Sequence, residues 1–224
     1  MLILIDVKLL GKGQTNGVSG YTKELVSALL ENTEHDYRLF YNGYKMNPLP
    51  EQWLKNTRVS VLNPRIPNKL FHLSARLFNV PKIDRIATDL IFSPHFHLLP
   101  SGKTPRIITF HDLSFIHYPQ FFSPKQRFWH WWQNYAKQAH EAKHIIAVSE
   151  YTKADLINIL KIPAEKITVI YSGISRHFKK LSTENLELRT FQESNRLTKP
   201  FFLFVGTLEP RKNIPTLIKA FAIL

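Results

Sequence analysis

The sequence contains no cysteine among its 224 residues. Disulfide bonds and thiolate metal sites are therefore excluded, and the absence fits a reducing compartment such as the cytoplasm. No apolar run approaches the roughly 20 residues that a membrane-spanning helix needs. Residues 1–6 are too short for a secretory signal and lack its basic segment. We therefore expect a cytoplasmic protein without a membrane-spanning helix.

Acidic side chains are scarce relative to basic ones. The chain has 30 Lys and Arg against 17 Asp and Glu, which gives a formal net charge of +13. Such a surplus favours anionic partners, namely nucleic acid, phospholipid or nucleotide diphosphates, without distinguishing among them. No recognised nucleic-acid-binding motif accompanies the charge, so we expect no nucleic-acid partner.

Predicted strands and helices alternate along most of the chain, which is 44% apolar and long enough to bury a core. Several predicted strands are continuously apolar, as strands covered on both faces are. The alternation predicts an α/β fold of Rossmann-like type, with a parallel sheet and helices on both faces. The predicted strands are residues 2–5, 37–41, 58–62, 90–92, 106–110, 145–148, 167–170 and 201–205. The predicted helices are residues 21–31, 69–78, 124–142, 151–160 and 184–191, with a last one after Asn213. Ser149 can cap the helix at 151–160.

Polar residues follow several of the predicted strands. They are Asp6, Ser93-Pro94-His95, His111-Asp112, Ser149-Glu150 and Ser172-Gly173. Ligands of parallel sheets bind outside the carboxyl ends of the strands, so we expect these residues to line a cleft. A purely structural role at the end of a strand remains the alternative for His111, because most histidines are structural or solvated.

Residues 11–20 form a predicted turn with four glycines between the first strand and the first helix. The spacing departs from the dinucleotide-binding fingerprint, because Asn16 stands where a third glycine is needed. It also departs from the Walker A motif, because Gly13 follows Lys12 where that motif has Ser or Thr. From the residues alone, the segment is either a flexible surface loop or a backbone that a phosphate can approach.

The end of the chain combines an apolar run at 201–205 with a glycine, two cations and a helix start. Arg211 and Lys212 lie in the polar turn, and Asn213 can cap the helix. A strand, glycine turn, cations and helix start together suit a phosphate. Adjacent cations are also commonly a solvated basic turn, and that alternative stays open here.

Two histidines, His95 and His97, lie on the same side of a predicted strand. This spacing corresponds to half a zinc site, but no third ligand is apparent in the sequence. We therefore expect no bound metal.

The segment 127–132 is rich in aromatic residues. Apolar positions with helical spacing predict that most of its rings pack against the sheet. Trp129 lies at the margin of that stripe, and with Lys125, Arg127 and Lys137 nearby it could instead contact an anionic bilayer at the inner face of the membrane. The stripe consists of Phe128, Trp131, Trp132, Tyr135 and Ala139.

Five segments, in their order along the chain, resemble motifs of retaining two-domain glycosyltransferases of the GT-B type, group 1 or family 4. Mannosyl- and rhamnosyltransferases of polysaccharide synthesis typify this family. The resemblance implies an N-terminal, acceptor-side Rossmann-like domain at 1–178, a linker at 179–199, and the first strand and helix of an incomplete nucleotide-sugar-binding domain at 200–224. The segments are Asp6 with 17–25, and residues 109–113, 146–156, 166–174 and 205–213.

The resemblance also implies roles for particular residues. In the family, a glycine loop approaches the donor diphosphate, the histidine of a His-Asp motif lies beside the transferred sugar, and cations neutralise the departing diphosphate. No metal or other cofactor is implied, and the sequence has no Asp-x-Asp to hold a metal. The corresponding residues are Gly17 and Gly20 for the glycine loop, His111 and Asp112 for the His-Asp motif, Arg211 and Lys212 for the cations, and Ser149 and Tyr118 for the acceptor side of the cleft.

The reaction that the resemblance implies is transfer of a hexose, with retention of configuration, from a nucleotide sugar to a growing glycan or lipid-linked acceptor. The donor would be GDP-mannose or a UDP- or dTDP-sugar. The family's Glu-x7-Glu motif is missing, since no two glutamates lie eight positions apart, so we expect that this chain alone does not transfer sugar. The alternative is a non-catalytic, truncated module that binds a glycan or a partner chain, with self-association or a second chain covering its exposed apolar surface.

Overall fold

The computed structural model describes residues 1–12, 17–43, 48–85, 88–175, 178, 186–197 and 199–223. The chain forms two compact units, Met1–Ser172 and Gly173–Leu224. The functional domain boundaries at residues 178 and 200 stay predictions. Residues 13–16 of the predicted glycine turn, and residues 179–185 and 198 of the predicted linker, lie outside the described residues.

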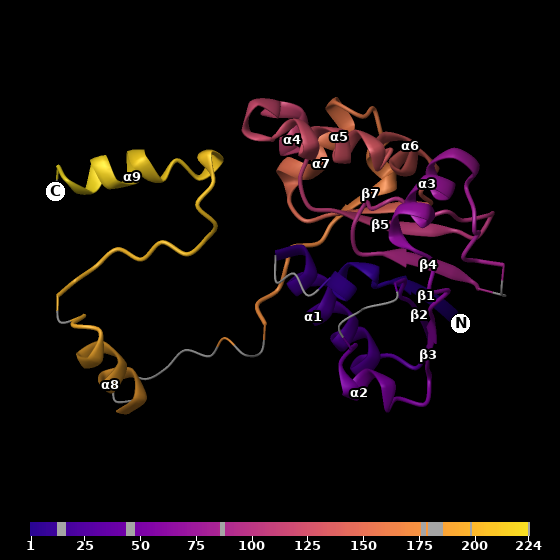
Figure 1. Cartoon of the computed structure of the whole chain (residues 1–224), viewed down its shortest axis with the longest axis horizontal. Helices are drawn as coiled ribbons and strands as arrows, with labels where there is room; N and C mark the ends of the chain where they lie inside the picture. Colours follow the sequence, from indigo (N-terminus) through magenta and orange to yellow (C-terminus); the bar gives the residue numbers. More distant parts are fainter. Residues whose placement is uncertain are drawn as a thin grey trace. The chain divides into compact units, whose positions relative to one another are not determined.

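Seven parallel strands form one sheet in the first unit, in the order β3-β2-β1-β4-β5-β6-β7 (Figure 1). The strand order changes direction between β1 and β4, which is where sheets of this kind bind ligands. The predicted Rossmann-like α/β fold is therefore confirmed. The strands are β1 Leu2–Asp6, β2 Asp36–Phe40, β3 Val59–Leu62, β4 Leu90–Ser93, β5 Arg106–Phe110, β6 His144–Ala147 and β7 Ile167–Val169.

Helices connect the strands of the first unit. The α-helices are α1 Gly17–Asn32, α2 Glu51–Leu54, α3 Asn68–Phe78, α4 Ser114–His117, α5 Pro124–Trp132, α6 Tyr135–Glu141 and α7 Glu150–Asn158, and the 3-10 helices are η1 Lys8–Lys12, η2 Pro119–Phe121 and η3 Ala164–Lys166. Helix α1 begins at Gly17 and not at Tyr21 as predicted, which places Gly17 and Gly20 inside a helix. Among the described residues, no helix has both the length and the apolar character needed to cross a bilayer.

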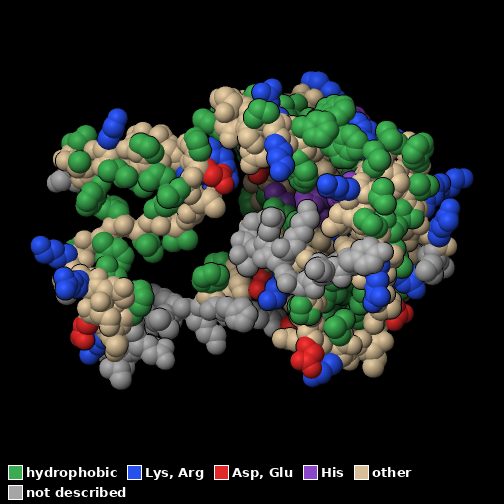
Figure 2. Space-filling view, in the orientation of Figure 1, with side chains coloured by type: hydrophobic (Ala, Val, Ile, Leu, Met, Phe, Trp, Pro, Cys, Tyr) green, Lys and Arg blue, Asp and Glu red, His purple; other side chains and the backbone are tan. Residues whose placement is uncertain are grey.

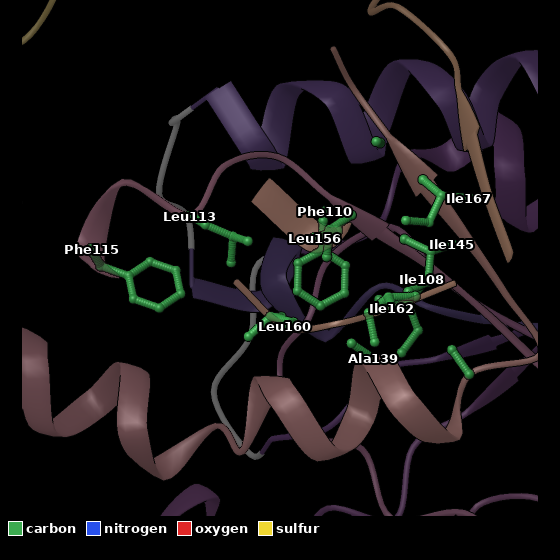
Figure 3. Close-up of a cluster of buried hydrophobic side chains, with 12 residues drawn as sticks. Ile108, Phe110, Leu113, Phe115, Ala139, Ile145, Leu156, Leu160, Ile162 and Ile167 are labelled. Carbon is green, nitrogen blue, oxygen red and sulfur yellow. The ribbon is translucent and has the colours of Figure 1, made fainter. Parts of the chain in front are cut away.

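Both faces of the sheet are buried, because neighbouring residues of one strand enter different cores. Leu4 of β1 packs in a cluster with Phe71 of α3, whereas Ile5 packs in a cluster with Val26 of α1. A third cluster joins β5, β6 and β7 to α4, α6 and α7 (Figure 3). This burial on both sides explains why the strands are continuous apolar runs in the sequence.

The predicted helix 124–142 is in fact two helices, so that prediction was wrong. Asn134 adopts a left-handed conformation, with φ of 54°, between α5 and α6. Asparagine tolerates this conformation better than most residues. At the break, Gln133 is buried and its Oε1 accepts a hydrogen bond from the backbone N of Leu98 at 2.8 Å. This hydrogen bond links the break to the segment between β4 and β5 and so stabilises the interrupted helix.

The predicted aromatic stripe divides at this break. Tyr135 and Ala139 pack on the core as expected. Phe128 and Trp131 are 57% and 59% exposed, so the prediction that they pack against the sheet was wrong. The regular helical phase is lost at the break, so residues on its two sides no longer share one face. Trp129, expected at the margin, instead packs against other aromatic rings of the first unit.

The second unit contains α8 Leu186–Ser194, η4 Pro210–Lys212 and α9 Ile214–Phe221. The helix predicted after Asn213 is confirmed as α9. The strand predicted at 201–205 is not formed, and its side chains are between 38% and 84% exposed. An apolar run becomes a strand only when a neighbouring strand satisfies its backbone, and the described residues provide no such neighbour there.

Burial distinguishes two leucines on predicted helices. Leu156 of α7 is fully buried, whereas Leu70 of α3 is 58% exposed. We expect Leu156→Ala to lower the free energy of unfolding by about 2–5 kcal/mol, because it leaves a cavity. Leu70→Ala should change that free energy by at most about 0.5 kcal/mol. Urea unfolding followed by tryptophan fluorescence measures both, and equal losses would contradict this assignment of the core.

Candidate active site

His111 directly follows β5 and is held on two sides. Its Nε2 donates to the carbonyl oxygen of Pro94 at 2.9 Å, and its ring meets the Tyr21 ring of α1 edge-on at 4.8 Å between centroids. A carbonyl only accepts hydrogen bonds, so Nε2 carries a proton and Nδ1 of the neutral ring is an acceptor. Burial lowers the pKa of His111, against the opposing effects of the Pro94 carbonyl and Asp112. The imidazole is therefore neutral near pH 7.

Ser149 is linked to His111 through the cap of α7. Its Oγ accepts a hydrogen bond from the backbone N of Thr152 at 3.1 Å, as predicted for a helix cap. The Thr152 hydroxyl donates in turn to the carbonyl oxygen of His111 at 3.1 Å. The cap therefore holds the backbone of the histidine, and the contact of Ser149 with an acceptor stays a prediction.

Asp112 and Tyr118 are both exposed. Asp112 Oδ1 accepts hydrogen bonds from the backbone N and the hydroxyl of Ser114, at 3.0 and 2.6 Å, and so shapes the turn into α4. Tyr118 follows α4, and its ring lies 5.9 Å from that of His117. Among the described contacts none joins Tyr118 to His111, so the structure does not bring these two residues together.

Gly17 and Gly20 lie in the first turn of α1, close in sequence to the Tyr21 ring that meets His111. Both are exposed, and a Cβ built at either position would meet nothing within 4 Å. Glycine inside a helix costs about 0.5–1 kcal/mol relative to alanine, and packing gives no reason for it here. The first turn carries no acidic residue that would compete for the positive end of the helix. Among the described residues, nothing crowds the positions of the two glycines at this helix start.

A buried ion pair lies at the carboxyl end of β1. Asp6 is fully buried, with Lys8 Nζ 2.7 Å from its Oδ2, and Lys8 Nζ also donates to Leu98 O at 3.0 Å. His95 Nε2 lies 4.0 Å from the same carboxylate oxygen. Burial, together with Lys8 and Arg106, lowers the pKa of His95 well below its usual value. The expectation that Asp6 and His95 line the cleft was wrong, because Asp6 is satisfied inside the protein.

The two histidines considered for a metal site, His95 and His97, make contacts within the first unit just after β4. His95 Nδ1 accepts a hydrogen bond from the backbone N of His97 at 3.3 Å, and the His97 ring meets that of Trp129 at 4.9 Å. In the part of the chain that the structure describes, no group of three or more His, Cys, Asp or Glu is placed to hold a metal ion.

Sequence reasoning missed three contacts near the site. The first is the contact of Tyr21 with His111. Tyr21 directly follows Gly20, so its position beside the glycine segment could have indicated it. Lys8 lies two positions beyond Asp6, an opposite charge just after a buried strand, and was also recognisable. The pair of His117 Nε2 and Asp155 Oδ1, 2.8 Å apart, joins α4 to α7 across 38 positions, and no local pattern indicates it.

In the second unit, Glu209 offsets one of the two predicted phosphate-binding cations. Arg211 Nε lies 2.5 Å from Glu209 Oε2. Hydrogen bonds from Thr207 and from Arg211 lower the pKa of Glu209. The prediction of a phosphate site at these cations did not include this carboxylate. Arg211 and Lys212 belong to the second unit, and their meeting with the glycines and His111 stays a prediction.

Three histidines of the first unit have a lowered pKa: His95, His111 and His130, whose pKa falls to about 4 on burial. As the pH falls below about 6.5, the unfolded chain therefore takes up protons before the folded protein does. The free energy of unfolding should be largest above pH ~6.5 and should decrease as the pH falls toward 4. Urea midpoints at about pH 7.5 and about pH 5 measure this change.

His130→Phe is the matched variant for that experiment. It keeps a ring against Phe115, on which His130 stacks at 4.0 Å, and removes one titrating group. Its stability should depend less on pH than that of the unmodified protein. An identical pH dependence for the two proteins would show that the pKa of the partly buried His130 is not lowered.

Comparison with known proteins identifies relatives that are about twice as long as this chain or longer. The chain is 25% identical over 222 residues to O-antigen chain mannosyltransferase B of Escherichia coli, covering 93% of this chain and 56% of that protein. It is 23% identical over 228 residues to O-antigen chain mannosyltransferase RfbU of Salmonella typhimurium, covering 97% and 58%. It is 22% identical over 251 residues to serotype-specific mannosyltransferase WbdA of Escherichia coli, covering 100% and 30%.

A solved structure shares the fold. The crystal structure of Anabaena HepE in complex with UDP and glucose matches with a TM-score of 0.53 and 16% identity, covering 92% of this chain and 54% of that chain. The family model of Glycosyltransferase Family 4 matches residues 15–178, which include α1, His111 and Ser149. The chain therefore belongs to Glycosyltransferase Family 4.

Proposed function

We propose that the chain is the acceptor-side part of a glycosyltransferase that transfers a hexose from a nucleotide sugar to a glycan or lipid-linked acceptor, with retention of configuration. The main support is the family match over residues 15–178, which contains the site where the start of α1 and His111 come together. Mannose is the first sugar to test, because the relatives named above are mannosyltransferases. GDP-mannose is then the first donor, with UDP- and dTDP-sugars as alternatives.

The start of α1 would hold the donor diphosphate. The positive end of a helix favours an anion, and the space at Gly17 and Gly20 lets it approach the backbone. His111 would lie beside the transferred sugar. Its neutral ring offers Nδ1 as an acceptor for a sugar hydroxyl, while Nε2 and the Pro94 carbonyl hold its orientation.

Departure of a nucleoside diphosphate builds negative charge, which fixed cations stabilise. Arg211 and Lys212 would supply that charge, with Glu209 reducing it by its ion pair with Arg211. In this proposal the cations take the part that a divalent metal plays elsewhere, so no resident metal is needed. Asp112, through its bonds to Ser114, would hold the turn that follows His111.

The chain spans about half the length of the curated relatives it matches, or less, and lacks the Glu-x7-Glu pair of the family. We propose that it does not transfer sugar alone and that further polypeptide supplies the rest of the donor site. The protein would work in the cytoplasm, at the inner face of the membrane. The absence of cysteine supports a reducing compartment.

A non-catalytic binding module is the second candidate function. The observation that favours it is the apolar surface of the second unit, where Phe202, Leu203, Val205 and Leu208 are each at least 76% exposed. A surface of this kind is covered by another copy or by a second chain. Restoration of sugar transfer by a second chain would favour the enzyme, whereas glycan binding without transfer in the assembled complex would favour the module.

Substitution of the two helical glycines distinguishes their effect on stability from their effect on donor binding. Gly17→Ala and Gly20→Ala should each raise the free energy of unfolding by about 0.5–1 kcal/mol, because the helix gains a better residue in open space. The added methyl groups should weaken GDP-mannose binding, measured by calorimetry, by about tenfold. Gly102→Ala is the contrasting variant, since its Cβ would lie 3.0 Å from Asp84 Oδ2, and it should lower stability without changing the affinity. Unchanged affinity in the stabilised variants would contradict the diphosphate site.

Transfer assays with GDP-mannose or UDP-glucose and a mannose oligosaccharide test the reaction. We expect no transfer by the purified chain, because the glutamates of the family motif are missing. Saturation-transfer NMR should still detect the oligosaccharide on the protein. The signal should be weaker after His111→Ala and unchanged after Lys55→Ala, which lies just after α2. Clear transfer would overturn the expected inactivity while supporting the reaction class. The proposed function would be overturned if the protein bound neither nucleotide sugars nor oligosaccharides.

A further inference from the structure

A groove of about 900 Å³ lies at the edge of the sheet opposite to the candidate active site. Its lining includes Arg106, the first residue of β5, and Lys143, which directly precedes β6. His111, by contrast, follows the last residue of β5. The C-terminal part of α3, the segment 98–106 and α6 form the remaining walls. The groove is therefore separate from the donor and acceptor residues proposed above.

The charge of this groove is strongly positive. Glu141 is the one carboxylate among the described lining residues, and it lies 3.6 Å from Lys137. Lys103 and Lys143 are exposed to solvent. The nearby Asp84 carboxylate is occupied by hydrogen bonds from the backbone of the turn at 102–104. The cations that line the groove are Arg76, Lys103, Arg106, Lys137, Lys143 and Lys166.

Not every one of these cations is available to a ligand. Arg106 is buried and donates to Ser93 Oγ at 2.9 Å, so it serves the fold. Lys166 donates to the carbonyl oxygen of His140. Lys103, Lys137 and Lys143 have exposed side chains at the rim and give the groove its capacity for anions.

An apolar ridge borders the groove. Helix α3 buries Phe71 and Ala75 against the sheet, yet its other apolar side chains are exposed, as are Phe128 and Trp131 of α5. Arg76 joins the two helices, because its guanidinium lies over the Trp131 ring at 5.3 Å. Figure 2 shows hydrophobic side chains gathered over the α3 and α5 side of the first unit, with Lys and Arg at their margin. The ridge consists of Leu70, Leu73, Leu77, Phe78, Phe128 and Trp131, each between 45% and 71% exposed.

Ridge and groove form a continuous surface, because Leu77 and Phe78 belong to both. Exposed apolar side chains beside cations match the boundary of a bilayer, where acyl chains lie next to lipid phosphates. Each cation near an anionic bilayer contributes about 1 kcal/mol of attraction. A protein partner would more often cover a patch with few charges at its centre.

We propose that the ridge and the basic groove dock the first unit on an anionic phospholipid bilayer. The ridge enters the headgroup boundary, and Lys103, Lys137 and Lys143 contact lipid phosphates. The proposal rests on and deepens the proposed function, since an enzyme with a lipid-linked acceptor works beside a bilayer, and it is tested without sugar transfer. It also replaces the expectation that Trp129 contacts the bilayer, because that ring packs against Phe96 and His97.

Co-sedimentation with vesicles tests the docking surface on the whole chain. We expect binding to phosphatidylcholine vesicles that contain phosphatidylglycerol and little binding to pure phosphatidylcholine. The double variant Lys137→Glu with Lys143→Glu should weaken binding at least about tenfold. Leu77→Ser with Phe78→Ser should weaken it by a similar factor and should leave the folded state intact, because both side chains are exposed.

Matched controls separate this surface from general charge and from the second unit. Lys55→Glu with Lys219→Glu makes the same change in net charge outside the groove, and Leu217→Ser with Ile218→Ser removes exposed apolar groups of α9. Both controls should bind as the unmodified chain does. Binding that is lost in the controls and kept in the ridge and groove variants would overturn the proposal. The proposal would also be overturned if the protein bound inorganic phosphate in the groove but did not bind the vesicles.

Discussion

Burial of a parallel sheet on both faces is the constraint on which the rest of this molecule depends. Adjacent residues such as Leu4 and Ile5 belong to different cores, so helices must cover each side of β1. Parallel strands also require a crossover between each strand and the next. The carboxyl ends of all seven strands therefore share one edge, and the helix starts at Gly17 and Glu150 lie at that edge beside His111.

Buried charge sets the position of the histidine at that edge. Asp6 and Lys8 form an ion pair that also reaches Leu98 O, and Arg106 bonds to Ser93 at the end of β4. Removing one partner of such a pair typically costs about 3–5 kcal/mol, because the other charge is left buried and unpaired. These bonds hold the segment after β4, which includes the Pro94 carbonyl oxygen that accepts the hydrogen bond from His111 Nε2. The position of His111 therefore depends on buried charges of neighbouring strands.

The two edges of the sheet have different chemistry. The carboxyl edge presents two exposed helical glycines and a neutral imidazole, and we propose that these bind a diphosphate and a sugar hydroxyl. The amino edge presents exposed lysines beside an apolar ridge, which suit a charged bilayer. Part of the net charge of +13 is thus concentrated at the groove, and the charge as a whole also favours association with anions.

The sequence by itself was sufficient for the parallel α/β sheet, the cap at Ser149 and the place of His111 at the end of a strand. Periodicity, capping and turn chemistry are local properties, and each can be recognised within a few residues. Only the tertiary structure decided that Leu156 is core while Leu70 is surface, and that the helix breaks at Asn134. It also decided that Asp6 is buried with Lys8. These outcomes depend on neighbours far away in the chain, such as Leu98, whose contacts no local pattern records.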